Sequence, residues 1–323
     1  MEKTVAYSAA TKGKLAVCKG KRASVEHEQT SGSPPRIHCI TSDIITMLQA
    51  DVCHAYHTLV NHGVKRENII VMMYDDIANH HNVEHLPNLE QSDAVTPENF
   101  LAILSGNTSA LEGGNGRVIH GTIEDRIFVY FSDHGGEGLI AFPNTRLTVK
   151  RLNVALKEMH RNHKFGQLVF YLEACESGSM FYNILRSNIN VYAITAANET
   201  ESSYATYCDN DLDLPCLGDE FSVNWMEDSD TEDINVERLD YQFQWVREIT
   251  QKSHVKRYGN MSIAQEPVAW FQEFQAQQKK VSWPSRDVEL MELQKKKLLS
   301  PQSTAIDLEI SRIQKTSLES AHA

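Results

Sequence analysis

The sequence predicts an α/β fold, a three-layer sandwich in which helices cover both faces of a mostly parallel central sheet. Four short apolar runs carry this prediction, and they lie at residues 68–73, 126–131, 168–172 and 191–196. Each run is rich in Val, Ile, Phe or Tyr, lacks polar alternation, and is bounded by polar or turn residues. Runs of this kind are typical of strands in a parallel sheet that is buried on both faces.

Helical patterns alternate with these strands. Apolar residues between Ile45 and Leu59 recur at helical spacing, and Gly63 supplies a stop signal. Residues 148–160, between two of the predicted strands, have the apolar period of a crossover helix. Residues 239–249 carry the apolar stripe of an amphipathic helix.

Composition divides the chain into three parts. Residues 1–42 are polar and basic and include the breaker cluster 31–35, so we predict a disordered or atypical N-terminal segment. Residues 43–271 form the predicted folded domain. Residues 272–323 are dominated by Gln, Lys, Glu and Ser, which indicates a linker followed by one or two solvated helices that bury little core.

Bulk properties narrow the choice of partners. The formal net charge of −12 argues against a phosphate backbone, so nucleic acid is not an expected partner. The longest apolar runs fall far short of the ~20 residues that span a bilayer, so we expect no membrane insertion. His80, His81 and His85 lie in a polar loop without a supporting ligand pattern, so neither a metal nor a cofactor is expected.

The signals for the secretory route point in both directions. The first residues lack the apolar segment of a secretory signal, so no signal peptide is predicted in this sequence. Three sequons, which begin at Asn107, Asn198 and Asn260, would accept glycans in a secreted chain, although chance sequons are common. Cys208 and Cys216 could bridge a local loop.

Two reactive side chains follow two of the predicted strands. His134 lies just beyond the run 126–131, and Cys175 lies just beyond the run 168–172. Reactive groups collect at the carboxyl ends of parallel strands, where neighbouring strand ends bring such side chains together. A histidine beside a cysteine gives a nucleophile and its base. Gly135 allows a close backbone approach, so that its N–H and that of Cys175 could face a developing oxyanion.

Each of these residues also has a structural interpretation. A single cysteine at a strand end is more often a small buried hydrophobic residue, and a single histidine is more often a hydrogen-bonded structural residue. The two together, each after an apolar strand and beside small residues, favour catalysis.

The residues around this pair resemble a known family. Asp-His-Gly at 133–135 and Glu-Ala-Cys-Glu-Ser-Gly-Ser at 173–179 look like the two catalytic motifs of legumains (asparaginyl endopeptidases), clan CD cysteine peptidases with a caspase/hemoglobinase-like fold. Further likeness lies at 50–56, 71–78, 218–219 and 224–229, and the resemblance runs from about residue 49 to residue 271.

The resemblance implies a cysteine endopeptidase that cleaves proteins after asparagine, and more slowly after aspartate, in an acidic lysosomal or vacuolar compartment. Its substrates would be proteins or peptides, cystatin-type inhibitors are candidate partners, and we expect a monomer. The family's pocket for the asparagine side chain matches Glu176, Ser202, Ser203 and Asp219 here. Carboxylates and hydroxyls suit a primary amide, which offers two donors and one acceptor.

The sequence departs from the family in the segment before the first helix. Ile45, Met47 and Leu48 stand where the family has Asn, Arg and His, and a methionine cannot supply the family arginine's hydrogen bond to the substrate amide. The resemblance also implies a first strand, for which only residues 36–40 offer a short match, and a C-terminal prodomain of which 272–323 would be a remnant.

Two other functions stay open. A catalytically impaired, legumain-like binding scaffold fits Ile45, Met47 and Leu48, whereas the intact His134 and Cys175 favour an enzyme. The catalytic subunit of the glycosylphosphatidylinositol transamidase shares the fold and the Cys-His pair, but the motif contexts at 173–179 and 224–229 match legumains better.

Overall fold

A computed structural model describes residues 2–8, 46–73, 94–208, 216–273 and 312. The chain divides into two compact units, Met1–Gln275 and Ala276–Ala323. The described residues belong to the first unit, except for Arg312 in the second. The predicted linker and prodomain remnant at 272–323 therefore lie almost wholly outside the described part of the chain, as do His80, His81 and His85.

A six-stranded sheet forms the centre of the first unit, with the strand order β11-β8-β7-β3-β1-β2. All neighbours pair in parallel except β11, which runs antiparallel to β8 at one edge. The strands are β1 (Glu2–Ser8), β2 (Ile69–Met73), β3 (Arg126–Ser132), β7 (Gln167–Glu173), β8 (Val191–Thr195) and β11 (Lys256–Gly259). The four predicted apolar runs are confirmed as β2, β3, β7 and β8.

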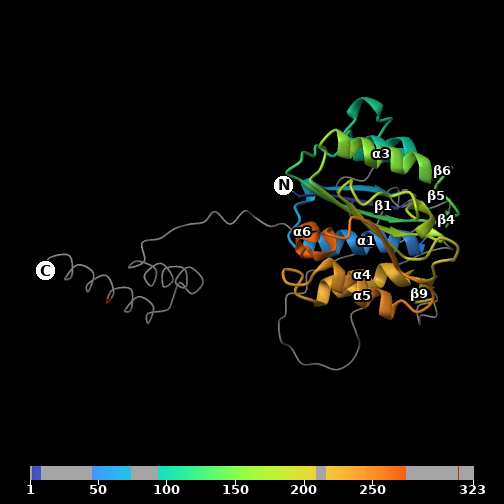
Figure 1. Cartoon of the computed structure of the whole chain (residues 1–323), viewed down its shortest axis with the longest axis vertical. Helices are drawn as coiled ribbons and strands as arrows, with labels where there is room; N and C mark the ends of the chain where they lie inside the picture. Colours follow the sequence, from blue (N-terminus) through green and yellow to red (C-terminus); the bar gives the residue numbers. More distant parts are fainter. Residues whose placement is uncertain (1, 9–45, 74–93, 209–215, 274–311, 313–323) are drawn as a thin grey trace, which may run out of the picture. The chain divides into compact units, whose positions relative to one another are not determined.

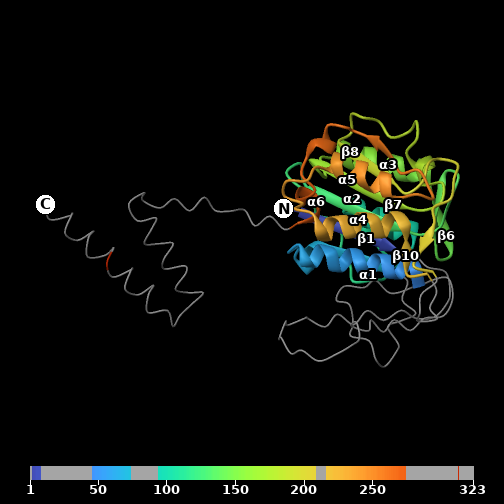
Figure 2. The same ribbon diagram turned by 90° about the horizontal axis from the view of Figure 1, so that it is seen from below.

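Helices cover both faces of this sheet, which confirms the predicted three-layer sandwich (Figure 1). One face carries α2 (Pro97–Ser105) and α3 (Val149–Arg161). The other carries α1 (Thr46–Asn61), α4 (Glu220–Thr231), α5 (Leu239–Ile249) and the short α6 (Ala269–Gln272). Figure 2 shows α1, α4 and α5 side by side across that second face. The predicted helices at 45–59, 148–160 and 239–249 correspond to α1, α3 and α5.

In β2, β3, β7 and β8, alternate residues enter different cores, which explains why these four strands are almost wholly apolar. In β3, Ile127, Val129 and Phe131 pack under α2 and α3. Phe128 and Tyr130 pack on the opposite side with Trp225 of α4, whose ring lies edge-on to both at centroid distances of 5.8 and 5.2 Å. A strand buried on both faces needs apolar side chains at every position.

Local sequence signals set several helix ends. At α2, the Thr96 hydroxyl accepts a hydrogen bond from the Asn99 N–H at 3.2 Å, and Pro97 fills the first helical position, where its missing N–H costs nothing. Gly106 ends the helix in the left-handed conformation at φ 71°. After α1, Gly63 has φ 83°, in agreement with the predicted stop.

Smaller elements lie between the strands of the central sheet. A three-stranded antiparallel sheet contains β4 (Gly135–Gly136), β5 (Leu139–Phe142) and β6 (Thr145–Thr148), and a two-stranded ribbon pairs β9 (Ala205–Thr206) with β10 (Gly218–Asp219). Single 3-10 turns lie at Arg66–Asn68, Thr108–Ala110, Ser177–Met180 and Ile263–Gln265. Among the described helices, none is long and apolar enough to cross a membrane.

The predicted disorder of residues 1–42 is wrong for residues 2–8. These residues form β1, which lies between β3 and β2 and pairs in parallel with both. The physical reason is that a central position in a sheet is held by backbone hydrogen bonds on two sides, which any extended segment of moderate β-propensity can make. The first strand sought at 36–40 lies outside the described residues.

Candidate active site

The loops that carry His134 and Cys175 leave the sheet side by side. Strands β3 and β7 are neighbours, and Ser132 at the end of one is in register with Glu173 at the end of the other. The pairing continues past the strands, because the Asp133 N–H donates to the Glu173 carbonyl at 3.1 Å. His134 comes two residues after Ser132, and Cys175 comes two residues after Glu173. The structure therefore brings the two predicted catalytic segments together at the carboxyl ends of the strands.

The backbone at Gly135 packs directly on the backbone at Cys175. A Cβ atom on Gly135 would lie 2.0 Å from the Cys175 carbonyl oxygen and 2.9 Å from the Ala174 Cβ. Only glycine allows this approach, as the sequence suggested.

The N–H of Gly135 also stays outside the β-ladder. Gly135 is in register with Ile140 of β5, and the neighbouring ladder bond runs from the Ala141 N–H to the His134 carbonyl at 2.9 Å. This pattern makes Gly135 and Ile140 a non-hydrogen-bonded pair, in which neither N–H points at the partner strand. The Gly135 N–H is therefore available to a ligand at the strand ends.

Cys175 lies on a tight turn between β7 and the 3-10 turn Ser177–Met180. Its side chain is half-buried, and its Sγ lies 3.9 Å from the Ser203 carbonyl oxygen. The next residue, Glu176, is left-handed at φ 49°, and its N–H donates to the Glu201 carbonyl at 2.7 Å. Because backbone strain of this kind is maintained only by surrounding contacts, the segment 197–203 holds the thiol in place.

Asp133 holds the histidine backbone. Its Oδ1 accepts from the His134 backbone N–H at 2.6 Å, and burial raises the pKa of this carboxyl well above its usual range. The imidazole itself is exposed.

The Ser179 hydroxyl joins the β4–β5 hairpin, which follows His134, to the turn that carries Cys175. It accepts from the Gly138 N–H at 2.8 Å and lies 3.4 Å from the Gly136 carbonyl, which it reaches as a donor. Both loops are thereby fixed to each other as well as to the sheet.

Three carboxyl groups are buried together beneath this edge. Asp51 of α1 accepts from the Asp219 N–H and from the Ser132 hydroxyl, each at 3.1 Å. Glu173 accepts from the N–H and hydroxyl of Ser222 at 3.2 and 3.0 Å. Asp51, Glu173 and Asp219 are each no more than 3% exposed.

Burial in this cluster favours the protonated carboxyl. It raises the pKa of Asp51 and Glu173 well above the ordinary range, and the charge of Asp219 raises both further. Burial also raises the pKa of Asp219 to about 6, against the opposite effect of its hydrogen bond with Asp51. Glu173 Oε1 and Asp219 Oδ2 are buried and have no hydrogen-bond partner of normal geometry among the described residues.

The predicted pocket residues divide into two groups. Asp219 belongs to the buried cluster, and Ser203 lies next to it, with its carbonyl at the thiol and its hydroxyl in range of Glu173. Ser202 is exposed and Glu176 is half-buried, so neither lies in the cluster.

Sequence reasoning missed Asp51 and Glu173. Signals for both were present, since Asp51 interrupts the apolar stripe of its helix and Glu173 ends a strand that is otherwise apolar.

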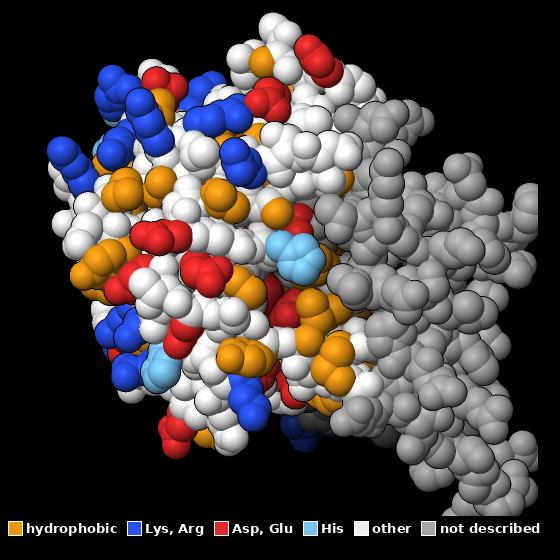
Figure 3. Space-filling model, turned by 90° about the vertical axis from the view of Figure 1, so that its right-hand side faces the viewer, with side chains coloured by type: hydrophobic (Ala, Val, Ile, Leu, Met, Phe, Trp, Pro, Cys, Tyr) orange, Lys and Arg blue, Asp and Glu red, His pale blue; other side chains and the backbone are white. Residues whose placement is uncertain are grey.

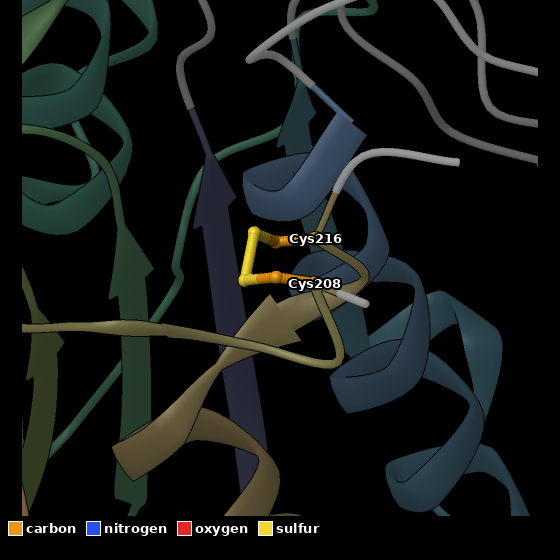
Figure 4. Close-up of a disulfide and its surroundings, with 2 residues drawn as sticks. All are labelled: Cys208 and Cys216. Carbon is orange, nitrogen blue, oxygen red and sulfur yellow. A yellow bond between two sulfur atoms is a disulfide. The ribbon is translucent and has the colours of Figure 1, made fainter. Parts of the chain in front are cut away.

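A disulfide closes the loop that leads into β10. Cys208 and Cys216 are bonded, as the sequence allowed, and Figure 4 shows the bond at the end of the β9–β10 ribbon beside α1. The ribbon carries Asp219, so the disulfide restrains a segment of the carboxyl cluster.

On the face shown in Figure 3, a histidine lies at the rim of a hollow with acidic side chains at its base.

The described residues contain no group of three or more His, Cys, Asp or Glu side chains that could hold a metal ion. The arrangement instead provides a half-buried thiol, an imidazole on the adjacent loop, and a buried acceptor cluster beneath both.

Comparisons with known proteins point to one family. Legumain from Rattus norvegicus is 46% identical over 241 residues, which cover 69% of this chain and 55% of that protein. Legumain from Homo sapiens is 45% identical over 253 residues, covering 73% and 57%. The vacuolar-processing enzyme delta-isozyme from Arabidopsis thaliana is 43% identical over 239 residues, covering 65% and 51%.

The chain thus spans about half the length of the curated relatives it matches. Among solved structures, caspase-1 from Spodoptera frugiperda is similar with a TM-score of 0.49 at 9% identity, covering 85% of this chain and 91% of that one. The family described as "Peptidase C13 family" matches residues 47–275, which include the loops of His134 and Cys175 and the carboxyl cluster. The chain belongs to the peptidase C13 family.

Proposed function

We propose that this chain is a cysteine endopeptidase that cleaves proteins and peptides after asparagine, and secondarily after aspartate, with Cys175 as nucleophile and His134 as its base. The observation that carries the proposal is the register of β3 with β7, which sets the two loops side by side with Gly135 against Cys175. A thiol beside an imidazole at the carboxyl edge of a parallel sheet is suited to acyl transfer.

The reaction begins with transfer of the Cys175 thiol proton to His134. The thiolate attacks the carbonyl carbon of the scissile peptide bond, and the carbonyl oxygen becomes an oxyanion that the N–H groups of Gly135 and Cys175 stabilise. The imidazolium then protonates the leaving amine, which gives a thioester. Water, deprotonated by His134, hydrolyses the thioester and releases the free thiol.

The carboxyl cluster supports the preference for asparagine. The amide NH₂ of an asparagine side chain donates two hydrogen bonds, and the free acceptor atoms on Glu173 and Asp219 would receive them. A side chain without those donors leaves buried acceptors unsatisfied, which rejects it strongly.

The pKa of Asp219 near 6 supports slower cleavage after aspartate in acid only. Below this pH a protonated Asp219 can donate to an aspartate side chain, and above it the ionised Asp219 repels one.

The route through the cell is part of the same proposal. The relatives named legumain and vacuolar-processing enzyme suggest a lysosomal or vacuolar compartment, and the Cys208–Cys216 disulfide fits a chain that passes through an oxidising environment. A cystatin-type inhibitor would compete with substrate at the edge that carries Cys175.

An Ala-Ala-Asn fluorogenic peptide tests the proposal. Purified chain should hydrolyse it at mildly acidic pH, an Ala-Ala-Asp peptide more slowly, and an Ala-Ala-Leu peptide, whose side chain has a similar shape to asparagine but no donors, hardly at all, while Cys175→Ala abolishes all activity. Equal cleavage of the Asn and Leu peptides would refute the proposed role of the carboxyl cluster. Activity that survives in Cys175→Ala would refute the nucleophile.

One observation favours the alternative of an impaired scaffold. Leu48, which stands where the family has a histidine, is 3% exposed and packs in the core, so it offers no polar group to a substrate. A folded chain that binds Ala-Ala-Asn peptides without hydrolysing them, and whose Cys175 is not alkylated faster than a free thiol, would support this alternative.

A further inference from the structure

Helix α5 presents two aromatic side chains to solvent on its outer face. Its inner residues Leu239, Phe243 and Val246 are buried against the rest of the domain. Tyr241 and Trp245, which are 56% and 52% exposed, lie one helical turn apart on the opposite face. Exposed tyrosine and tryptophan on a rigid helix are the residues that most often anchor protein interfaces.

Two charges flank this pair on the same stripe. Arg238 is the N-cap residue, one turn before Tyr241, and Glu248 follows Trp245 by one turn. Both lie at the helix end whose dipole disfavours them, since a cation is unfavourable near an N-terminus and an anion near a C-terminus. Arg238 donates to Gln265 Oε1 at 3.2 Å, which leaves the other N–H donors of its guanidinium for a partner.

The stripe Arg238–Tyr241–Trp245–Glu248 is complementary to itself when reversed. If a second α5 packs antiparallel about a two-fold axis near the middle of the helix, Arg238 of one copy lies opposite Glu248 of the other, and Tyr241 lies opposite Trp245. Each charge also meets the helix end of the partner that favours it. A two-fold interface requires this kind of self-complementary surface.

We propose that this stripe is a docking surface for a second copy of this chain, which forms an antiparallel α5–α5 dimer. The order of charges along the stripe favours a second copy as the partner. A helix that binds the stripe antiparallel needs an acidic residue opposite Arg238, an aromatic pair in the middle and a basic residue opposite Glu248, and α5 itself has this order. A single pair of helices is a small interface beside the ~1,200 Å² that stable interfaces bury, so we expect a weak dimer that dissociates on dilution. At high local concentration, the proposed dimer replaces the monomer that we expected from the sequence.

Sedimentation velocity of the full chain over a wide concentration range tests the proposal without reference to catalysis. The wild type should show concentration-dependent dimerisation, and Trp245→Glu should weaken it at least tenfold. Val154→Glu, at an exposed apolar position of α3, is the matched control and should dimerise as the wild type does. Circular dichroism and thermal unfolding establish that every variant is folded.

A charge exchange tests the antiparallel register. Arg238→Glu and Glu248→Arg should each weaken dimerisation at least tenfold, and the double variant should restore it, because the paired charges are exchanged on both sides. A wild type that stays monomeric at every concentration overturns the proposal and leaves the stripe to a different partner. Dimerisation of Trp245→Glu at wild-type strength, or no restoration in the double variant, overturns it as well.

Discussion

Gly135→Ala should separate catalysis from folding. The new Cβ would lie 2.0 Å from the Cys175 carbonyl oxygen, whereas real Cβ atoms essentially never come within 3.0 Å of another atom. The obstacle is backbone, so no side-chain rotation relieves it, and the two loops must separate by about 1 Å. A displacement of this size near the reacting groups costs roughly 10²-fold in rate, or about 2.7 kcal/mol of transition-state stabilisation.

The adjacent glycine gives a matched control. A Cβ on Gly136 would meet only Leu139, at 3.5 Å, which is an ordinary contact. We expect Gly136→Ala to keep kcat/KM for an Ala-Ala-Asn peptide within threefold of the wild type, and Gly135→Ala to lose about 10²-fold, with thermal unfolding measured for both. If Gly135→Ala kept wild-type kcat/KM, the close packing of the two loops would not matter for catalysis and the reasoning would be refuted.

Three further predictions concern the carboxyl cluster, the disulfide and the Ser179 bridge. Burial raises the pKa of Asp219 from 3.8 to about 6, so between these values the folded chain holds a proton that the unfolded chain has released. The free energy of unfolding should therefore fall by on the order of 3 kcal/mol as pH rises through this range. The raised pKa values of Asp51 and Glu173 act in the same direction. Urea unfolding at several pH values should show this slope, and Asp219→Asn should flatten it; an unchanged slope would contradict the assignment. Cys208 and Cys216 are separated by 8 positions in the sequence, and replacing both by serine should lower the free energy of unfolding by about 2.5 kcal/mol and raise KM. Unchanged values in urea unfolding and peptide assays would argue against the restraint on β10. Ser179→Ala should cost about 1–2 kcal/mol in urea unfolding and lower kcat, because the Gly138 N–H loses its acceptor; a rise in KM alone would instead assign Ser179 to substrate binding.

The fold was predictable wherever burial leaves a pattern in the sequence. Strands β2, β3, β7 and β8 are apolar at nearly every position because both faces of the sheet are covered, and α3 shows a regular apolar period. Strand β1 was missed because its place is defined by backbone pairing with β2 and β3, and backbone pairing leaves no apolar run.

The placement of His134 and Cys175 on neighbouring loops was predictable from the sequence, and their surroundings were less so. His134 and Cys175 follow strand ends, a position that topology links to reactivity. Asp51 and Glu173 stand out in the sequence as acidic residues in apolar surroundings, but their burial depends on how α1 and α4 pack at the sheet edge. Ser202 was expected in the pocket together with Ser203, but its side chain is exposed, whereas Ser203 is half-buried.

The most direct test of the catalytic pair is labelling of the purified chain at mildly acidic pH with an asparagine-directed electrophile, followed by mass spectrometry of the modified peptide. We expect modification at Cys175, strongly reduced modification in His134→Ala, and no modification at the buried Cys53. A folded chain that remains unmodified at Cys175, or that is modified there equally well without His134, would contradict the claim that these two residues act as nucleophile and base.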